Sequence, residues 1–418
     1  MRIRVAATLG ALALAAAVVS AGRDQARASA PPSPFLVDLK PSPPNAAAGS
    51  AEPNLTVDAR GRVWLSWLEP ADAGRMKFQL ASLDVAAGTW GPTITVASGD
   101  KLLANWADFP SIFAASNGTL AAHWLERGAA RGSYGIRVAI SSNGGRTWTS
   151  AVTPHRDDSA SEHGFVSFFE SPATGLGLVW LDGREMAGGH ATTGHAGAMT
   201  LRSTSIAKDG TAGTETVIDT RVCDCCQTAA ARTADGVLVA YRDRSDKEIR
   251  DIVVSRFEKG AWTPPTVVGA DNWEINGCPV NGPAVAATGN AAAVAWFTAV
   301  GNTPRTQIAF SGDGGRTFGA PMRVDAAPTL GRVGLVMIGE NRALVSSIER
   351  AQTGAQLVVR DIRRDGPAGA AVTIAPMSPD RTSGFPRVVV AGRTAIFAWT
   401  EVAPGKPTQV RVIRALIR

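Results

Sequence analysis

Short apolar runs alternate with polar turns along the chain, and one such pattern returns seven times. In each copy an apolar run reaches a marker position, usually aromatic, and a carboxylate or an arginine follows one or two residues later, as in "VWLSWLE". The marker positions are Trp67, Trp124, Trp180, Tyr241, Trp296, Ser347 and Trp399. The intervals between successive markers are 57, 56, 61, 55, 51 and 52. This regularity indicates an internal repeat.

Each repeat predicts four short strands. In four copies a proline opens a β-prone run at a nearly constant distance before the marker, at Pro53, Pro110, Pro283 and Pro386. Proline is tolerated at the first residue of a strand, where no backbone donor is needed. A turn rich in Gly, Asn and Asp follows, then the marker strand and two more strands. We therefore predict an all-β propeller of seven four-stranded blades, with six blades as the alternative.

The last repeat is incomplete, which predicts how the ring closes. After the marker strand the chain supplies one more β-prone run, Gln409–Leu416, and then stops. A similar run, Ser33–Lys40, stands near the N-terminus and has no place in the first repeat. Pairing these two segments would complete the seventh blade and remove an exposed strand edge. We expect a single propeller domain over residues 33–418.

The N-terminal residues have the pattern of a secretory signal peptide. Arg2 and Arg4 precede the apolar run Val5–Val19, and small residues follow at two places where cleavage is expected. We predict a signal peptide over residues 1–21, with cleavage after residue 30 as the alternative, and a linker over 22–32. The mature protein would then be secreted or periplasmic. No later segment is apolar for long enough to cross a membrane as a helix.

Charge excludes one class of partner. The formal net charge is +6, and removal of Arg2 and Arg4 with the signal peptide would lower it to +4. This is mild for a chain of 418 residues, and no basic run is present, so nucleic acid is not an expected partner. The partners that remain are a glycan, a small molecule or a protein of the cell envelope, and we expect a monomer.

Two turns carry a recognisable hairpin motif, "SSNGGRTW" (141–148) and "SGDGGRTF" (311–318). In the second, the Asp313 carboxylate can accept backbone N–H groups across the turn, and Gly315 allows a backbone geometry that other residues resist. Both segments are similar to the Asp box of sialidase-like (BNR-repeat) propellers. The matching positions are Ser141, Asn143, Gly145, Thr147 and Trp148 in the first copy, and Ser311, Asp313, Gly315, Thr317 and Phe318 in the second.

This resemblance implies a propeller fold and an exo-acting glycoside hydrolase, but the family's active site does not carry over. Sialidases bind the substrate carboxylate with an arginine triad and use a tyrosine nucleophile, a glutamate and an aspartate. The first blade has "AEPNLTV" where the family has its arginine motif. Of the two tyrosines, Tyr134 precedes an Asp-box strand and Tyr241 is a repeat marker. The catalytic candidates are Tyr241, Arg242, Asp243 and Arg387.

The four cysteines are predicted to meet at one site. Three stand in "VCDCCQTA" as Cys223, Cys225 and Cys226, and the fourth is Cys278. Cys223 and Cys278 stand at the same distance before their markers, which places them at equivalent positions of blades four and five. Candidate ligand-binding residues at the same face of the ring are Gln227, Asn281, Arg242, Arg244, Asp182 and Arg184.

The chemistry of the cysteines is left open by their spacing. Neighbouring cysteines bridge only through a strained ring, so the favoured disulfide joins Cys278 to one of the other three. The alternative is a soft metal ion, Cu or Zn, held by the thiolates. Three functions remain. The first is a propeller that binds a ligand or a soft metal at this face. The second is an exo-acting glycoside hydrolase of sialidase type with a non-classical active site, and the third is an envelope scaffold that docks a protein partner.

Overall fold

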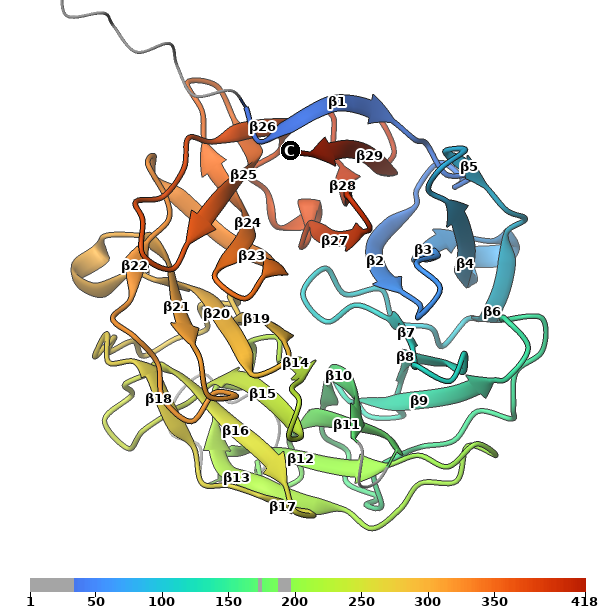
Figure 1. The fold of residues 1–418 in the computed structure, drawn as a ribbon. Coiled ribbons are helices and arrows are strands. Elements are labelled where there is room, and N and C mark those ends of the chain that lie inside the picture. Colours follow the sequence, from blue (N-terminus) through green and yellow to red (C-terminus); the bar gives the residue numbers. More distant parts are fainter. Residues whose placement is uncertain (1–33, 172–174, 187–196) are drawn as a thin grey trace, which may run out of the picture. The chain divides into compact units, whose positions relative to one another are not determined.

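Seven antiparallel sheets surround a central axis in the computed structural model, which describes residues 34–171, 175–186 and 197–418 (Figure 1). The predicted signal peptide and linker lie outside the described residues. Phe35–Arg418 forms one compact unit. The prediction of an all-β propeller with seven blades, rather than six, is confirmed. No helix among the described residues is long and apolar enough to cross a membrane.

The strands follow the repeat. Blades one to three contain β2 (Ala51–Val57), β3 (Val63–Pro70), β4 (Met76–Asp84), β5 (Thr89–Trp90) and β6 (Ile94–Gly99); β7 (Ser111–Ala114), β8 (Leu120–Arg127) and β9 (Tyr134–Ser141); and β10 (His163–Ser171), β11 (Gly175–Asp182), β12 (Met199–Ser205) and β13 (Thr216–Val222). Blades four and five contain β14 (Ala229–Arg232), β15 (Val237–Arg242), β16 (Ile252–Glu258), β17 (Ala261–Trp262) and β18 (Thr266–Gly269), then β19 (Ala284–Thr288), β20 (Ala291–Thr298), β21 (Arg305–Ser311) and β22 (Met322–Arg323).

Blades six and seven complete the ring. They contain β23 (Thr329–Gly339), β24 (Arg342–Arg350), β25 (Ala355–Arg363) and β26 (Val372–Met377), then β27 (Arg387–Ala391), β28 (Thr394–Glu401), β29 (Gln409–Ile417) and β1 (Leu36–Pro41). Three short 3₁₀ turns lie in loops: η1 (Asp72–Gly74), η2 (Val300–Asn302) and η3 (Arg381–Ser383). Blade two departs from the predicted four strands. After β9 its chain makes a single bridge, Val138 to Val152, and Pro154 then supplies no backbone donor that could extend the pairing.

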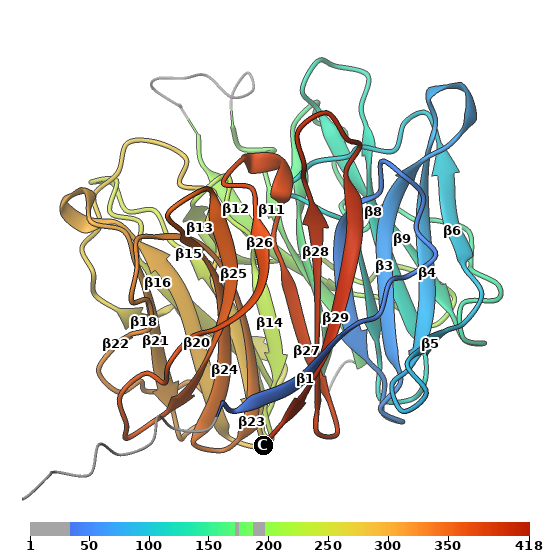
Figure 2. The same cartoon turned by 90° about the horizontal axis from the view of Figure 1, so that it is seen from above.

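The N-terminal strand closes the ring, as predicted. β1 pairs antiparallel with β29, with Leu36 opposite Ile417 and Pro41 opposite Ile413. Figures 1 and 2 show β1 running along the outer side of β29. The seventh blade therefore contains both ends of the described chain, and the pairing of β1 with β29 covers the strand edge that each would otherwise expose.

The repeated tryptophans hold the blades together from within. Trp67, Trp180 and Trp296 are completely buried. The indole N–H of Trp67 donates to Glu69 at 2.8 Å, and Trp180 donates to Asp182 at the same distance. A buried indole needs an acceptor. The carboxylate two residues after the aromatic, which recurs in the sequence pattern, therefore satisfies a core hydrogen bond in these blades.

The first strand of each blade lines the centre of the ring, and three of these strands begin with the same distortion. Glu52, Phe165 and Arg332 stand at the same position of their repeats, counted back from the marker, and their φ angles are 57°, 53° and 54°. The pairing register shifts at each of these places. Such bulges redirect side chains at the rim of a sheet. The loops that precede the inner strands form one opening of the ring, called here the channel mouth.

Candidate functional site

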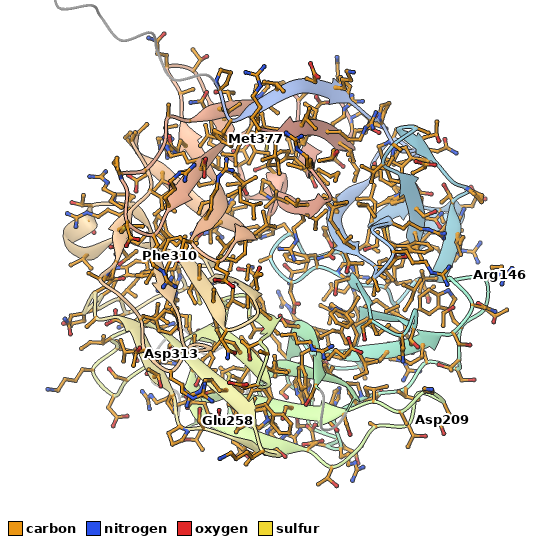
Figure 3. The ribbon with its side chains drawn as sticks, in the orientation of Figure 1. Arg146, Asp209, Glu258, Phe310, Asp313 and Met377 are labelled. Carbon is orange, nitrogen blue, oxygen red and sulfur yellow. The ribbon has the colours of Figure 1, made fainter. Side chains whose placement is uncertain are left out.

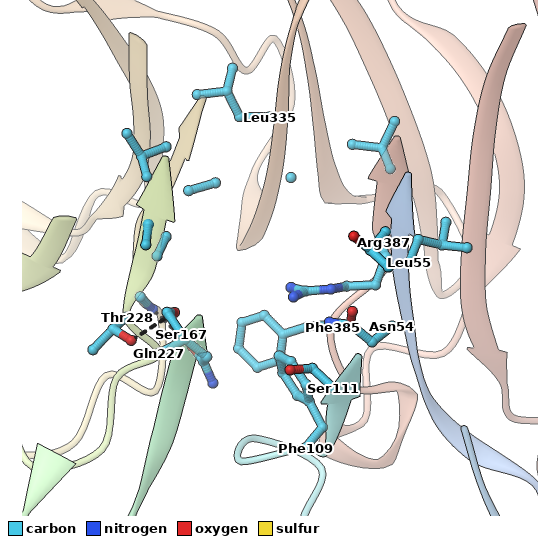
Figure 4. Close-up of a pocket in the computed structure, with 18 of the residues that line it drawn as sticks. Asn54, Leu55, Phe109, Ser111, Ser167, Gln227, Thr228, Leu335, Phe385 and Arg387 are labelled. Carbon is cyan, nitrogen blue, oxygen red and sulfur yellow. Dashed lines mark hydrogen bonds between the residues drawn. The ribbon is translucent and has the colours of Figure 1, made fainter. Parts of the chain in front are cut away.

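A cavity of about 360 Å³ occupies the central channel. Residues from the inner strands of all seven blades line it, together with the loops at the channel mouth. Arg387 reaches into this space from β27, near Phe109 and Phe385 (Figure 4). Ser167, Gln227 and Thr228 form part of the opposite wall. Cavities of this size accommodate small organic ligands.

The thiol cluster lies in the loop between β13 and β14. The sulfur of Cys223 is 3.9 Å from that of Cys225 and 3.3 Å from that of Cys226. All three sulfur atoms lie within 4.8 Å of one another. A disulfide would require about 2.05 Å, and all four cysteines are free thiols in this structure. The loop is anchored where the Cys223 N–H donates to the Arg242 carbonyl at 3.0 Å.

Cys278 reaches the same cluster from blade five. Its sulfur lies 3.7 Å from the Asp224 carboxylate, and the ligand atoms of Asp224, Cys225 and Cys278 lie within 4.8 Å of one another. Cys225 is therefore common to both groups of potential ligands. Cys223 and Cys278 stand at equal distances before their markers, and this spacing predicted that Cys278 lies beside the other three cysteines. The structure places Cys278 next to Cys225 and Asp224.

Buried cations surround the thiols. A guanidinium nitrogen of Arg250 is 3.3 Å from Cys223 Sγ and 3.2 Å from Asp224 Oδ1. Burial would raise the pKa of Cys223, but the neighbouring thiols and the guanidinium groups of Arg250 and Arg242 hold that pKa well below its usual value. Burial and the nearby Cys223 raise the pKa of Cys226. Cys223 therefore ionises more readily than Cys226, and thiolates are the forms that bind metals.

Gln227 and Asn281 are committed to bonds between blades. Gln227 donates to the Ala107 carbonyl at 2.5 Å, and its side-chain oxygen accepts from the Gly282 N–H at 3.0 Å. The side-chain oxygen of Asn281 accepts from the Arg332 N–H at 2.7 Å. Both residues lie at the channel mouth, as predicted for ligand-binding candidates, but these polar groups already join neighbouring loops.

Arg242 and Arg244 are also engaged within the protein. The Arg242 guanidinium is buried and donates to the carbonyls of Arg250, Asn281 and Phe297 at 2.6 to 3.2 Å. It stacks 5.0 Å from the centre of the Trp273 ring. Arg244 pairs with Glu248 at 2.7 Å. Arg242 therefore fastens blade four to blade five, directly behind the thiol cluster.

The remaining catalytic candidates do not converge. Tyr241 is buried among core side chains, and its hydroxyl lies 2.9 Å from Asp219 and 3.2 Å from Ser255. Burial raises the pKa of Asp243 to about 6. Arg387 stands in the channel in β27, on the opposite side of the ring from β15, which carries Tyr241 and which Asp243 follows directly (Figure 1).

Asp182 and Arg184 belong to an ionic network in blade three. Arg184 contacts Asp182 at 2.7 Å and Asp157 at 3.2 Å. Asp157 also faces His155 and His163 at 3.1 Å each, and the ligand atoms of these three residues lie within 4.8 Å of one another. The Arg184 guanidinium already supplies the positive charge that these carboxylates need.

The two turns that resemble the Asp box carry Arg146 and Asp313, which Figure 3 labels away from the centre of the ring. Asp313 Oδ1 accepts the backbone N–H groups of Arg316 at 3.0 Å and Thr317 at 2.9 Å, and the Thr317 hydroxyl donates to Oδ2 at 2.6 Å. Asn143 makes the equivalent bond to the Thr147 N–H at 3.0 Å. These side chains form turns far from the channel, and they present no chemistry to it.

Sequence reasoning missed a group of acids at the channel mouth. Burial, followed by the nearby Asp108, raises the pKa of Glu52 to about 8. Burial raises the pKa of Asp108 to about 7. A Cβ atom at Gly164 would come within 1.9 Å of Asp108 Oδ2 and 2.9 Å of a Tyr134 ring carbon, so both side chains press against that glycine.

The repeat itself contained the signal for these acids. Asp108 and Cys225 stand at the same position of their repeats, counted back from the markers Trp124 and Tyr241. Equivalent positions of different blades converge on the channel mouth, so a systematic reading of that register would have placed Asp108 there.

No protein-family model and no curated protein matches the sequence. Solved structures do match. A protein of unknown function from Dyadobacter fermentans is 14% identical with a TM-score of 0.53, and the match covers 92% of this chain and 100% of that one. The phage phi92 endosialidase is 11% identical with a TM-score of 0.51, over 91% of this chain and 69% of the other. An ulvan lyase, a polysaccharide lyase, is 11% identical with a TM-score of 0.57, over 89% and 95%.

At these identities the likeness shows the fold alone. The chain shares its propeller fold with proteins whose names describe action on glycans, and the residues of its own channel mouth must carry any statement about function.

Proposed function

We propose that the protein binds a soft metal ion, Cu(I) or Zn(II), through Cys223, Cys225 and Cys226, with Cys278 as a further ligand. The observation that carries this proposal is the approach of three sulfur atoms to within 4.8 Å of one another. Four sulfurs around one zinc ion at about 2.3 Å would stand about 3.8 Å apart. The sulfur–sulfur distances of 3.9 Å (Cys223 to Cys225) and 3.3 Å (Cys223 to Cys226) are close to that value.

The surrounding charges support a thiolate site. Bringing three thiolates together is costly unless positive charge compensates them. Arg250, whose side chain is 3% exposed, contacts Cys223, and Arg242 lies nearby. Soft thiolate ligands favour Cu(I) and Zn(II) over harder cations. The N-terminal segment leads us to propose further that the site works outside the cytoplasm, where a free thiol cluster without a bound metal would tend to oxidise.

The test is a metal titration on protein purified anaerobically without chelator. Cu(I) affinity is measured by competition with bicinchoninate, and bound zinc by elemental analysis, with the free thiols counted in parallel. We expect one ion per chain. Cys225→Ser should weaken binding by at least 100-fold, because Cys225 belongs to both ligand groups, and Cys278→Ser should weaken it less.

Thr228→Ser is the matched control, because it changes a neighbouring hydroxyl residue and leaves all four sulfurs in place. An unchanged affinity in Cys225→Ser would reject the metal site. Two free thiols in place of four, with no metal bound, would favour the disulfide.

A glycoside hydrolase is the second candidate, favoured by one observation. Asp108 is among the residues that line the channel cavity, its pKa is about 7, and Tyr134 lies beside it. A carboxyl group with such a pKa suits general acid catalysis near neutral pH. If this is the activity, Asp108→Asn and Tyr134→Phe should each abolish hydrolysis of aryl glycosides. Tyr241→Phe should retain it, because Tyr241 is a core residue. No hydrolysis by the parent protein of an aryl glycoside panel would reject this candidate.

A further inference from the structure

The thiol cluster contains two sets of potential metal ligands that share one cysteine. The inner set is Cys223, Cys225 and Cys226, and the outer set is Asp224, Cys225 and Cys278. Building on the metal site proposed above, we propose that its ion is an exchangeable cargo, Cu(I). The inner set holds the ion, and the ion passes to and from thiolate complexes in solution through Cys278 of the outer set.

The two sets differ in exposure. Cys223 and Cys226 are 1% and 2% exposed, so an ion among the inner sulfurs is shielded from solvent. Cys278 is exposed, and Cys225, which belongs to both sets, is half-buried. A structural zinc site is closed, with its ligands packed around the ion. An exposed sulfur beside a buried set of sulfurs is instead the arrangement that gives an ion a route to solvent.

Cys225 allows the ion to move between the sets without losing all its ligands. The ligand atoms of each set lie within 4.8 Å of one another, so a shift from the outer set to the inner set is short. An ion stripped of ligands inside a protein would be very costly. Because Cys225 stays bonded while Cys278 is exchanged for an inner sulfur, the ion has a thiolate ligand at every stage.

The outer set binds a soft ion more weakly than the inner set. It offers a carboxylate oxygen where the inner set offers a third sulfur, and a soft ion prefers sulfur to oxygen. The Asp224 carboxylate is also engaged elsewhere, because its Oδ1 atom accepts from the Arg250 guanidinium at 3.2 Å. The ion is therefore drawn inward after it arrives, and Cys278 is left free to exchange again. Zinc, which needs a fourth ligand, would retain Cys278.

The loop that carries Cys278 is fixed on both sides of the cysteine. Before it, the Ile275 N–H donates to the Glu248 carbonyl at 3.0 Å. After it, the Gly282 N–H donates to the Gln227 side chain at 3.0 Å. Both acceptors stand in loops next to strands of blade four, which also follows the other three cysteines in the chain. The fold therefore positions the exposed sulfur beside the cluster.

The exchange is a ligand substitution in which copper remains Cu(I). A thiolate compound in solution brings the ion. The bond from copper to the donor sulfur breaks as the bond to Cys278 Sγ forms, and the proton of the Cys278 thiol passes to the released donor thiolate. Each further thiol that binds the ion releases its proton to water.

The rate of copper release tests this role. Protein carrying one Cu(I) is mixed without oxygen with glutathione, and bicinchoninate captures the copper that leaves, which is read from its colour in a stopped-flow instrument. We expect Cys278→Ser to slow release tenfold or more, because the ion loses the ligand through which it reaches solvent. Were Cys278 a permanent fourth ligand, its removal would speed release. Asn276→Ser, at an exposed position of the same loop, is the matched control and should release copper within twofold of the parent rate.

A second measurement needs no substitution. With the ion held by the inner set, Cys278 should react with iodoacetamide in the loaded protein, while the inner cysteines are protected. Peptide mass spectrometry identifies the alkylated residue. Protection of all four cysteines in the loaded protein would overturn the proposal, because it would mean that Cys278 is a permanent ligand.

The outcomes separate this role from the metal site itself. No Cu(I) bound by the parent, or an unchanged affinity in Cys225→Ser, would reject the metal site and the exchange with it. Tight Cu(I) binding by the parent, with release from Cys278→Ser as fast as from the parent or faster, would reject the exchange alone and leave a structural metal site.

Discussion

Replacing Glu52 with glutamine should change how stability depends on pH. Burial raises the pKa of Glu52 to about 8, and one of its carboxyl oxygens has no hydrogen-bond partner among the described residues. In the unfolded chain the group titrates near 4.5. Between these two values the unfolded state releases a proton that the folded state keeps, so the free energy of unfolding falls as pH rises from about 4.5 to about 8.

The size of this effect follows from the shift. Each pKa unit corresponds to about 1.4 kcal/mol, so the full shift from 4.5 to about 8 is worth on the order of 5 kcal/mol. Glu52→Gln removes the titration and keeps the shape of the side chain. Most of that change falls between pH 5 and pH 8, so over this range the variant should gain on the order of 4 kcal/mol relative to the parent.

The assay is urea unfolding of both proteins at half-unit steps of pH, in reductant. Glu340→Gln, at an exposed position, is the control and should follow the parent at every pH. Parallel curves for the parent and Glu52→Gln would refute the reasoning, because they would mean that Glu52 is ionised in the folded protein at neutral pH.

Two further substitutions test the packing of the channel mouth. Gly164→Ala should lower the free energy of unfolding in urea by about 1–3 kcal/mol, because its Cβ would overlap Asp108 and Tyr134. The control Gly99→Ala, whose Cβ would have its nearest neighbour at 3.9 Å, should change that free energy by less than about 0.5 kcal/mol. Arg242→Met should cost about 3 kcal/mol or more, since three buried carbonyls lose their donor; a loss below about 1 kcal/mol would show that Arg242 does not fasten blades four and five.

The fold was predictable because one pattern is repeated. The marker side chains, five of them tryptophans, recur at the same position of every blade, so the period of the markers indicated the number of blades. Pairing of the two termini followed from the missing strand of the last repeat. Blade two shows the limit of such reasoning. Pro154 ends the pairing after a single bridge, so the fourth strand is missing, although the marker of this blade is regularly spaced.

The position of a side chain at the channel mouth could be predicted, but its hydrogen-bond partners could not. Cys278, Gln227 and Asn281 lie at the mouth, as their spacing from the markers required. Whether a polar group there is free depends on which groups of the neighbouring blade face it. Gln227 meets the Ala107 carbonyl and the Gly282 N–H, so both ends of its amide are taken.

Arg387 shows the converse case. It lies in β27, the strand before its marker Trp399, and the described neighbours of that strand offer its guanidinium no acceptor. Nothing in its local sequence distinguishes it from Arg242, which donates to three carbonyls. In a propeller the two faces of an inner strand belong to different surroundings, the channel and the adjoining blade. Only the assembled ring therefore reveals which polar groups remain after neighbouring blades have satisfied one another.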